Sequence, residues 1–451
     1  MTHYLGRLFY FVFSFIKVNL QLYRNMNHSI EQKIIAYRRH FHANPELGWL
    51  EYCTAAFIAD ELSHLGFDVK RGAEIMHVDN LMGLPDEQAN KIAFERAEKI
   101  FGPEKMQAFA NNATAVAGVL KCGNGPLVAI RVDMDALPIA ESGAKDHYPH
   151  QVGFNSETKG VMHACGHDGH MAIGLGLAQY LRKYWEQLSA NYILLFQPAE
   201  EGVRGAASIV KSGFLKDVDY LLAAHLWSNM PLGKLVCSQN GTAATDKLDV
   251  TFYGKAAHAG ICPEKGNNAI LAAANTTLAL HDLQLDGEGL RRVNVGRMEG
   301  GTARNIIADS AKLEVELRSD SQSIENEMLE GLERIVKHSA QKQGCSFEIK
   351  KVGKASAACG DDSLAKLIKD EAKNMDCFSE VILSDKVNRG SEDFTSLMND
   401  VQSRGGKACF IGVGASLPGK HLEHHTPNFD IAESALHPTV ELIFNLIKKI
   451  R

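Results

Sequence analysis

The chain has 451 residues and a formal net charge of −6, and this length predicts two domains or one large domain with an insertion. Hydrophobic residues make up 45% of the sequence and charged residues 23%, which is typical of a globular protein. The absence of a basic excess argues against nucleic-acid binding, because many cations are needed to neutralise phosphates.

The chain begins with an apolar segment, LFYFVFSFI, at residues 8–16. This segment is shorter than the ~20 apolar residues that cross a bilayer, and no small-residue cleavage site follows it. We expect translation to start at Met26 and residues 1–28 to be a non-core extension; an interfacial anchor and a signal peptide are the alternatives. Membrane contact is not expected. The nine cysteines have no repeating spacing, which favours reduced thiols and a cytoplasmic protein.

Helices and strands alternate through the first half of the chain. Ser29 is a predicted N-cap for the first helix, and a second helix is expected to end at Gly66. Residues 85–110 and 171–184 predict further helices. Apolar runs predict strands at residues 116–120, 127–132, 192–196 and 220–225. This alternation predicts an α/β fold with a mostly parallel sheet and helices on both faces.

The pattern changes at about Asp246, where a β-α-β-β-α-β order begins. Its predicted helices cover residues 268–283 and 324–343. This order predicts a small α+β, ferredoxin-like domain inserted into the larger one. The expected division of the chain is an extension at 1–28, a catalytic domain made of 29–243 and 356–451, and an inserted domain at 244–355.

The segment MHACGHDGH, at residues 162–170, concentrates side chains that can ligate a metal. Gly166 allows the side chains of Cys165 and His167 to turn toward one point. Thiolate and imidazole are good ligands for zinc and similar divalent ions. We expect His163 and His170 to lie around the metal or on the substrate side, and Asp168 to be a supporting carboxylate.

Other candidate groups follow predicted strands. PAEE ends a buried strand, and adjacent residues there cannot face one point, so one of Glu200 and Glu201 is expected to ligate a metal while the other acts as general base. His225 ends another strand, and His425 lies in EHHTPNFD near the C-terminus. Because reactive groups gather at the carboxyl ends of parallel strands, these residues predict a catalytic metal site.

Six motifs occur in the order seen in the metallopeptidase M20 family, and the chain resembles its aminoacylase and carboxypeptidase branch from about Tyr37 onward. The motifs are HACGHDGH, QPAEEG, GKAAHAG, GGTARNIIAD, GSEDF and HHTP. Within this branch, MGLPDE, LLAAHLW and RRVNVGRMEGGTARN resemble enzymes that hydrolyse p-aminobenzoyl-glutamate. The resemblance implies a zinc-exopeptidase-like catalytic domain and an inserted lid and dimerisation domain.

The resemblance also implies roles for individual residues. The family's ligands for two divalent ions, manganese or zinc, match Cys165, His167, Glu201, His225 and His425. Glu200 matches the catalytic glutamate, and Asp133 matches an aspartate that supports the metal pair. His258, Asn305 and Arg318 match residues that hold the substrate carboxylate and the developing oxyanion. His258 is expected to reach the active site of a partner subunit.

The function implied by this resemblance is metal-dependent hydrolysis of an N-acyl amino acid, first of all p-aminobenzoyl-glutamate, to p-aminobenzoate and glutamate. A broader aminoacylase, a dipeptidase and an indole-acetyl-amino-acid or hippurate hydrolase are alternatives. A redox or metal-storage protein and a non-catalytic ligand-binding subunit belong to other classes. We expect a homodimer, or a heterodimer with a homologous subunit. The residues Ser391, Glu392 and Asp393 are expected either to contact substrate or to cap a helix.

Overall fold

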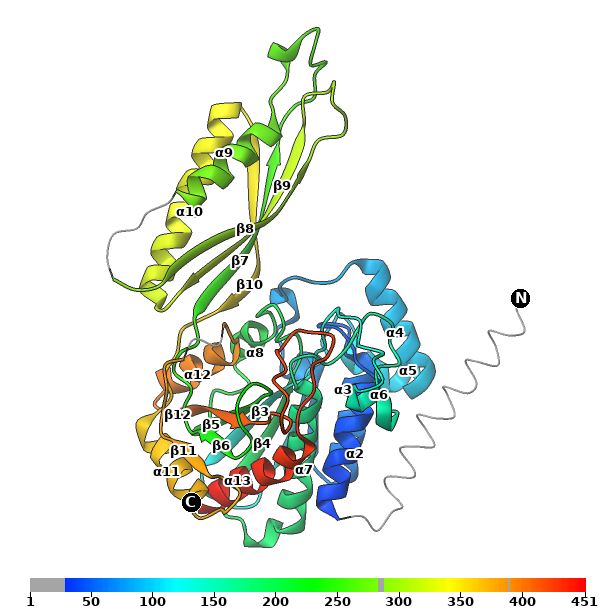
Figure 1. Ribbon diagram of the computed structural model, residues 1–451, viewed down its shortest axis with the longest axis vertical. Coiled ribbons are helices and arrows are strands. Elements are labelled where there is room, and N and C mark those ends of the chain that lie inside the picture. Colours follow the sequence, from blue (N-terminus) through cyan, green and yellow to red (C-terminus); the bar gives the residue numbers. More distant parts are fainter. Residues whose placement is uncertain (1–28, 283–287, 388–389) are drawn as a thin grey trace, which may run out of the picture.

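The computed structural model describes residues 29–282, 288–387 and 390–451. A broad unit contains an eight-stranded sheet, and a narrower unit with a four-stranded sheet projects from it (Figure 1). The predictions for residues 1–28, including the start at Met26, lie outside the described residues. Among the residues that are described, no helix is long and apolar enough to cross a membrane.

The elements of the two units follow one another along the chain. The helices of the larger unit are α2 (Ile30–Ala43), α3 (Tyr52–His64), α4 (Glu87–Phe101), α5 (Pro103–Met106), α6 (Tyr148–Val152), α7 (His167–Lys183), α8 (Ala206–Ser212), α11 (Asp362–Ala372), α12 (Phe394–Ser403) and α13 (Leu436–Lys449). Its strands are β1 (Asp68–Arg71), β2 (Val116–Leu120), β3 (Leu127–Asp133), β4 (Asn191–Gln197), β5 (Tyr220–Trp227), β6 (Lys234–Val236), β11 (Glu380–Ile382) and β12 (Lys407–Gly414). The smaller unit contains β7 (Ala244–Tyr253), α9 (Ala269–His281), β8 (Arg291–Gly300), β9 (Ser310–Ser319), α10 (Gln322–Gln343) and β10 (Ser346–Ala355).

The eight-stranded sheet has the order β1-β2-β4-β3-β5-β12-β6-β11. Its central strands β4, β3, β5 and β12 are parallel, whereas β1 and β2 are antiparallel to their neighbours. Alternate residues of β3 enter two apolar clusters: Val128 and Ile130 pack in the cluster that includes α7 and α13, and Ala129 packs in the cluster that includes α8 and α12. The predicted α/β fold with a mostly parallel sheet and helices on both faces is confirmed.

The four-stranded sheet has the order β10-β7-β9-β8, and all its neighbouring strands are antiparallel. One face buries Leu248, Val250 and Leu313 in the cluster that contains α9 and α10. The other face carries polar side chains. Because β7 has ten residues, it extends over about 33 Å. The loops beyond its far end are therefore remote from the eight-stranded sheet (Figure 1).

Local signals in the sequence explain where several helices begin and end. The Ser29 hydroxyl accepts a hydrogen bond from the backbone N–H of Gln32, which confirms the predicted N-cap of α2. Gly66 follows α3 with a φ of +81°. Helix α7 begins at His167 instead of residue 171, because Gly166 adopts a φ of +92° and turns the chain into the helix. This earlier start places His167 and His170 on the first turn of α7.

Candidate metal centre and active site

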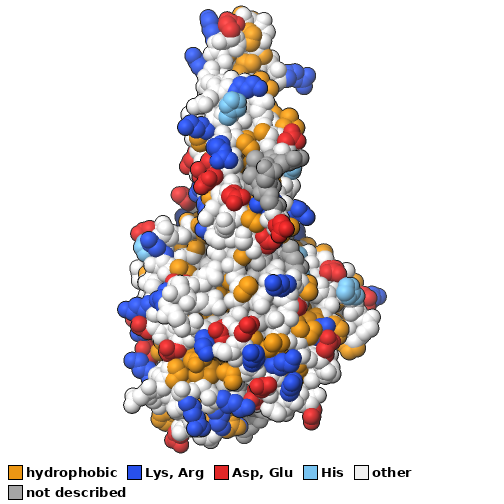
Figure 2. All heavy atoms as spheres, turned by 90° about the vertical axis from the view of Figure 1, so that its left-hand side faces the viewer, with side chains coloured by type: hydrophobic (Ala, Val, Ile, Leu, Met, Phe, Trp, Pro, Cys, Tyr) orange, Lys and Arg blue, Asp and Glu red, His pale blue; other side chains and the backbone are white. Residues whose placement is uncertain are grey.

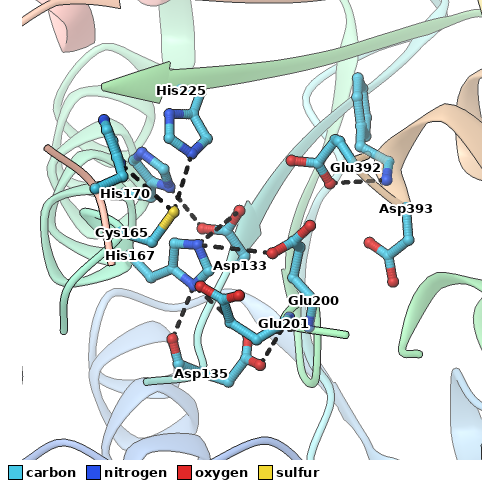
Figure 3. Close-up of polar contacts among 12 residues, drawn as sticks. Asp133, Asp135, Cys165, His167, His170, Glu200, Glu201, His225, Glu392 and Asp393 are labelled. Atoms are coloured by element: carbon cyan, nitrogen blue, oxygen red, sulfur yellow. Dashed lines mark hydrogen bonds and ion pairs between the residues drawn. The ribbon is translucent and has the colours of Figure 1, made fainter. Parts of the chain in front are cut away.

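The predicted metal ligands lie together at the carboxyl edge of the parallel strands, and Figure 3 shows four of them, Cys165, His167, Glu201 and His225. Cys165, His167 and His225 form one group in which the possible ligand atoms all lie within 4.8 Å of one another. Cys165, Glu201 and His425 form a second group by the same measure. Cys165 belongs to both. The structure therefore presents two adjacent sets of metal-ligating atoms that share one thiol, which we call the donor groups.

The hydrogen bonds of two imidazoles show that the donor groups fit divalent ions. Nδ1 of His167 donates to the carbonyl oxygen of Asp135 at 2.8 Å, and Nδ1 of His225 donates to that of Leu226 at 3.0 Å. Each bond leaves a lone pair on Nε2. His167 Nε2 is buried and makes no hydrogen bond within the described part of the chain, while His225 Nε2 lies 3.6 Å from Cys165 Sγ. Imidazoles backed by carbonyl acceptors in this way are typical of metal sites.

Asp133 and His170 lie directly behind the donor groups. His170 Nδ1 donates to Asp133 Oδ1 at 2.6 Å, and His170 Nε2 accepts from the backbone N–H of Leu226 at 3.0 Å. The other carboxylate oxygen, Asp133 Oδ2, accepts from Arg131 at 2.7 Å. Burial acts to raise the pKa of Asp133, but His167, His170 and Arg131 hold that pKa well below its usual range. Asp133 is thus an ionised carboxylate beside the donor groups, where a supporting aspartate was expected.

A strained turn after β4 carries the two adjacent glutamates. Ala199 has a φ of +51°, a left-handed conformation that is costly for a residue with a Cβ atom. The backbone N–H groups of Glu200 and Glu201 both donate to the Asp135 carboxylate at 2.9 Å. Glu201 enters the second donor group, and Glu200 Oε2 lies 3.9 Å from His167 Nε2. Ligand atoms of Glu200, Glu201 and His167 also lie within 4.8 Å of one another, so the expectation that the two adjacent glutamates cannot face one point is wrong. Asp135 was not among the predicted site residues, although the sequence DMD carries two aspartates where β3 ends.

The pKa values of two groups at the site are shifted toward their protonated forms. Burial raises the pKa of Glu200 well above its usual range, and neighbouring carboxylates, that of Glu392 first, raise this pKa further. Hydrogen bonds to Cys165 and Glu201 raise the pKa of His425 to about 10. A buried cluster of anionic ligand atoms with these shifts retains protons unless a cation replaces them.

His424 is a second residue that sequence reasoning did not assign. Its Nδ1 lies 3.7 Å from Cys165 Sγ, and its Nε2 accepts from the backbone N–H of Ser228 at 3.2 Å. The motif HHTP contained both histidines, but only His425 was singled out. His425 itself has a φ of +60°, so the backbone at this position is strained next to the donor groups.

The acidic pair of the GSEDF motif is held by buried Arg131. Its guanidinium donates to Glu392 Oε1 at 2.9 Å and to Asp393 Oδ1 at 3.1 Å. Asp393 Oδ2 also accepts from the backbone N–H groups of Gly205 and Ala206 at the start of α8, at 3.0 and 2.9 Å. The helix end that Asp393 caps is therefore that of α8, and its side chain makes no capping bond to α12, which follows it.

Asp168 and His163, both in the segment MHACGHDGH, lie outside the donor groups. Asp168 Oδ2 accepts from Arg38 Nε at 3.0 Å and from His42 Nδ1 at 2.8 Å, so this carboxylate joins α7 to α2. The buried ring of His163 makes no hydrogen bond to any described residue.

A cavity of about 350 Å³ opens onto the donor groups. The donor end is lined by Cys165, Glu200, Glu201, His225 and His425, with Trp227 and Phe410 beside it. The wall that faces the four-stranded sheet is lined by Thr242, Lys247, Arg318 and Ser391. The cavity is therefore acidic at the donor end and basic at the other, and Arg318 is placed there together with the predicted ligands.

His258 and Asn305 lie elsewhere in the chain. Both are exposed, in the loops beyond the far ends of β7 and β8. These loops are joined by a bridge between His258 and Ile306 and by a hydrogen bond of 3.0 Å from the Ala259 N–H to the Asn305 carbonyl. A single chain thus brings Arg318 to the cavity but keeps these two predicted substrate-binding residues at the opposite end of the smaller unit.

The fold and this site define a metal-dependent hydrolase, because candidate ligands from separate segments of the chain surround a cavity beside a buried carboxylate. Residues 129–449 match the family model described as peptidase family M20/M25/M40, and the chain belongs to this family.

Individual relatives agree with this assignment. The chain is 39% identical over 417 residues to the p-aminobenzoyl-glutamate hydrolase subunit from Escherichia coli (strain K12), covering 92% of this chain and 95% of that protein. It is 39% identical over 409 residues to indole-3-acetyl-aspartic acid hydrolase of Enterobacter agglomerans, covering 90% and 93%. The aminobenzoyl-glutamate utilization protein of Klebsiella pneumoniae is similar in structure, with a TM-score of 0.79, 36% identity and coverage of 92% and 95%. The predicted family, fold class and hydrolase activity are confirmed.

Proposed function

We propose that the protein hydrolyses the amide bond of an N-acyl amino acid, with p-aminobenzoyl-glutamate as the first candidate substrate. The observation that carries this proposal is the buried Glu200 carboxylate, which lines one cavity together with the donor groups and Arg318. A substrate with its amide at the donor end can extend its carboxylate to the guanidinium. The names of the Escherichia coli and Klebsiella relatives point to the same substrate.

Two divalent ions per chain are proposed as cofactors. The residues that would hold them are Cys165, His167, Glu201, His225 and His425. A thiolate favours zinc, whereas carboxylates also suit manganese, so both metals are candidates. When bound, the ions supply Lewis-acid activation of water and of the scissile carbonyl.

Glu200 is the proposed general base. Its carboxylate takes a proton from the attacking water and delivers that proton to the leaving nitrogen as the C–N bond breaks. Divalent ions held by the neighbouring donor groups would lower the raised pKa of Glu200 and so let the carboxylate act as a base. Asp135 fixes the position of Glu200 through its backbone N–H. Arg318 binds the α-carboxylate with two parallel hydrogen bonds.

The four-stranded unit is proposed to be a separate domain, residues 244–355, that covers the site and joins two protomers. Apolar side chains exposed on this unit support an interface: Ile261 is 77% and Leu278 is 68% exposed, and Figure 2 shows hydrophobic side chains at the surface of the narrow unit. A second protomer would also give a use to His258 and Asn305. We propose that His258 stabilises the developing oxyanion in the partner's active site, and that Asn305 helps to bind the substrate carboxylate there.

The proposed assembly is a homodimer or a heterodimer with a homologous subunit. The location proposed for it is the cytoplasm, because all nine cysteines are free.

A Glu200→Gln variant tests the proposed activity. Protein stripped of metal and reloaded with Mn²⁺ or Zn²⁺ is assayed with p-aminobenzoyl-glutamate, and its metal content is measured. We expect the variant to keep its metal and to lose turnover by roughly 10²- to 10⁴-fold. Glu186→Gln, a change of an exposed glutamate, is the control and should behave as the wild type. Near-normal hydrolysis by Glu200→Gln contradicts the proposal.

Indole-3-acetyl-aspartate is a second candidate substrate. The Enterobacter relative that bears this name is as similar in sequence as the Escherichia coli relative. Trp227 and Phe410 line the cavity, and aromatic walls suit either a p-aminobenzoyl or an indole-acetyl group. The ratio of kcat/KM for the two compounds decides between them.

A further inference from the structure

The basic wall of the cavity holds more donors than one carboxylate requires. It is lined by Thr242, Lys247, Arg318 and Ser391. Arg318 can bind one carboxylate by itself, through two parallel N–H bonds. Lys247 and the two hydroxyl groups are then left for a second anionic group in the same cavity.

The hydroxyl groups of Thr242 and Ser391 can hydrogen-bond a polar ligand. Thr242 Oγ1 and Ser391 Oγ are buried, and neither makes a hydrogen bond to a described residue. The two loops that carry them are joined by a hydrogen bond of 3.0 Å from the Ala243 N–H to the Gly390 carbonyl. Buried polar groups are normally bonded, because an unpaired one keeps the full cost of leaving water. Two such groups that line one cavity are available to a polar ligand bound there.

The two cations of this wall already converge on a carboxylate oxygen. Arg318 Nη2 lies 2.9 Å and Lys247 Nζ lies 3.9 Å from the same atom, Oε1 of Glu316. Lys247 and Glu316 are paired across β7 and β9, and Arg318 is two residues beyond Glu316, so all three share one face of the sheet. A Cβ atom added to Gly390 would lie 3.9 Å from Arg318 Nη1, so the guanidinium lies beside the loop that carries Ser391. On this face of the sheet two positive charges stand against one negative charge, and Glu392, which also lines the cavity next to Ser391, is paired with Arg131.

We infer that Lys247, with the hydroxyls of Thr242 and Ser391, binds a second carboxylate of the substrate, next to the one held by Arg318. In an N-acyl amino acid that second carboxylate is the side chain of glutamate or aspartate. This inference rests on the proposed function and narrows its substrate class to N-acyl derivatives of acidic amino acids. A glutamine derivative has the same shape, but its side-chain amide has no negative charge to pair with the lysine ammonium.

Matched substrates test the inference. Hydrolysis of p-aminobenzoyl-glutamate and p-aminobenzoyl-glutamine is compared for the metal-loaded wild type and Lys247→Gln. We expect Lys247→Gln to lower kcat/KM for the glutamate derivative by roughly 10- to 100-fold and to leave that for the glutamine derivative unchanged. Lys350→Gln is the matched control, since Lys350 is an exposed lysine opposite Asp249 in the same sheet. An equal loss on both substrates, or an unchanged preference, overturns the inference.

A binding measurement separates this inference from the proposed hydrolysis. In a Glu200→Gln background, which leaves the ligand intact, calorimetric titrations compare the two derivatives with Lys247 present and with Lys247→Gln added. We expect tighter binding of the glutamate derivative only when Lys247 is present, and Thr242→Val should weaken the same derivative selectively. If wild-type protein hydrolyses neither compound but this preference is found, the hydrolase proposal is wrong and the binding site stands. Equal affinities for both derivatives with Lys247 present overturn the site.

Discussion

The two units of the molecule differ in whether their polar side chains are buried or exposed. In the larger unit, the polar side chains of the site are mostly buried and bonded to one another, as Asp133, His170 and Arg131 show. In the smaller unit, the polar residues lie on an open sheet face or in end loops, and His258 and Asn305 are exposed. The difference indicates that one chain assembles the candidate metal ligands but leaves two of the three proposed substrate-binding residues outside the cavity.

The units meet next to the loop that carries Glu200 and Glu201. The Lys354 N–H, at the end of β10, donates to the Val203 carbonyl at 2.8 Å. Val203 follows Glu200 and Glu201 closely and has a φ of +58°. The smaller unit is thus hydrogen-bonded directly to the loop that carries Glu200 and Glu201, whereas His167 and His225 are held by α7 and β5 of the larger unit.

The largest effect is expected from Cys165→Ala, which tests whether the larger unit holds a complete metal pair. Because Cys165 belongs to both donor groups, its loss should weaken both metals. We expect less bound metal per chain and a decrease in kcat/KM of at least about 10³-fold, since single catalytic groups contribute about 10²–10⁴. Metal analysis and steady-state kinetics measure these changes. Cys359→Ala, a change of an exposed cysteine, should alter neither, and normal metal content in Cys165→Ala would contradict the shared-thiol arrangement.

The next prediction tests whether His258 acts in a second protomer. His258→Ala should lower kcat by roughly 10²- to 10³-fold through loss of an oxyanion donor. Mixing this variant with Glu200→Gln, after dissociation and reassembly, should restore activity, because each mixed dimer gains one complete site. Random reassembly gives about one quarter of wild-type activity for a twofold dimer. No recovery in verified mixed dimers would place His258 outside the partner's site.

Arg318 should behave differently in the same experiment, because it lines the cavity of its own chain. Arg318→Ala should raise KM for N-acyl amino acids by roughly 10- to 100-fold, and mixing with Glu200→Gln should not rescue it. Analogues that lack the α-carboxylate should be affected least. Rescue by mixing, or an equal rise in KM for those analogues, would show that Arg318 does not bind the α-carboxylate in its own protomer.

Sequence reasoning reached the donor groups because each one follows a recognisable strand or motif. Cys165 and His167 flank a glycine, and Glu201 and His225 follow apolar strands, so the rule for parallel sheets placed them together. The sequence did not predict the roles of Asp135 and His424, because both side chains accept hydrogen bonds from backbone N–H groups whose orientation only the fold defines. Asp135 accepts a hydrogen bond from the Glu200 N–H in a turn where Ala199 has a left-handed backbone conformation. Alanine does not normally indicate such a conformation, so the sequence did not predict the turn. The cluster of charged side chains around Lys247 was not predicted either, because Lys247 lies next to Glu316 only through the pairing of β7 with β9.

The start of α7 shows the same limit. The glycines and histidines of MHACGHDGH looked like a loop, yet Gly166 turns the chain so that the helix begins within the motif. Propensity underestimated the helix because buried contacts between α7 and its neighbours outweigh the weak helix preference of glycine. Gly174 and Gly176 are accommodated for this reason: added Cβ atoms would lie 2.9 Å from Phe196 and 2.6 Å from Ile34.

The smallest effects are expected on stability alone. They compare a buried ion pair of the larger unit with a partly exposed ion pair of the smaller unit. His42 donates to Asp168 and contacts Glu141 at 3.0 Å. Burial acts to lower the pKa of His42, but these two carboxylates raise it to about 9. Because this pKa exceeds the unfolded value of about 6.5, the stabilisation is complete below pH 6.5 and is lost as the pH rises to 9. His42→Gln should therefore lower Tm by several degrees at pH 6, corresponding to roughly 2–3 kcal/mol, and much less at pH 9.5.

Lys312→Gln, which breaks the partly exposed pair with Asp249 in the smaller unit, should change stability by less than about 0.5 kcal/mol at either pH. A deficit in His42→Gln that stays constant with pH would mean that the ring acts by packing and not by its charge.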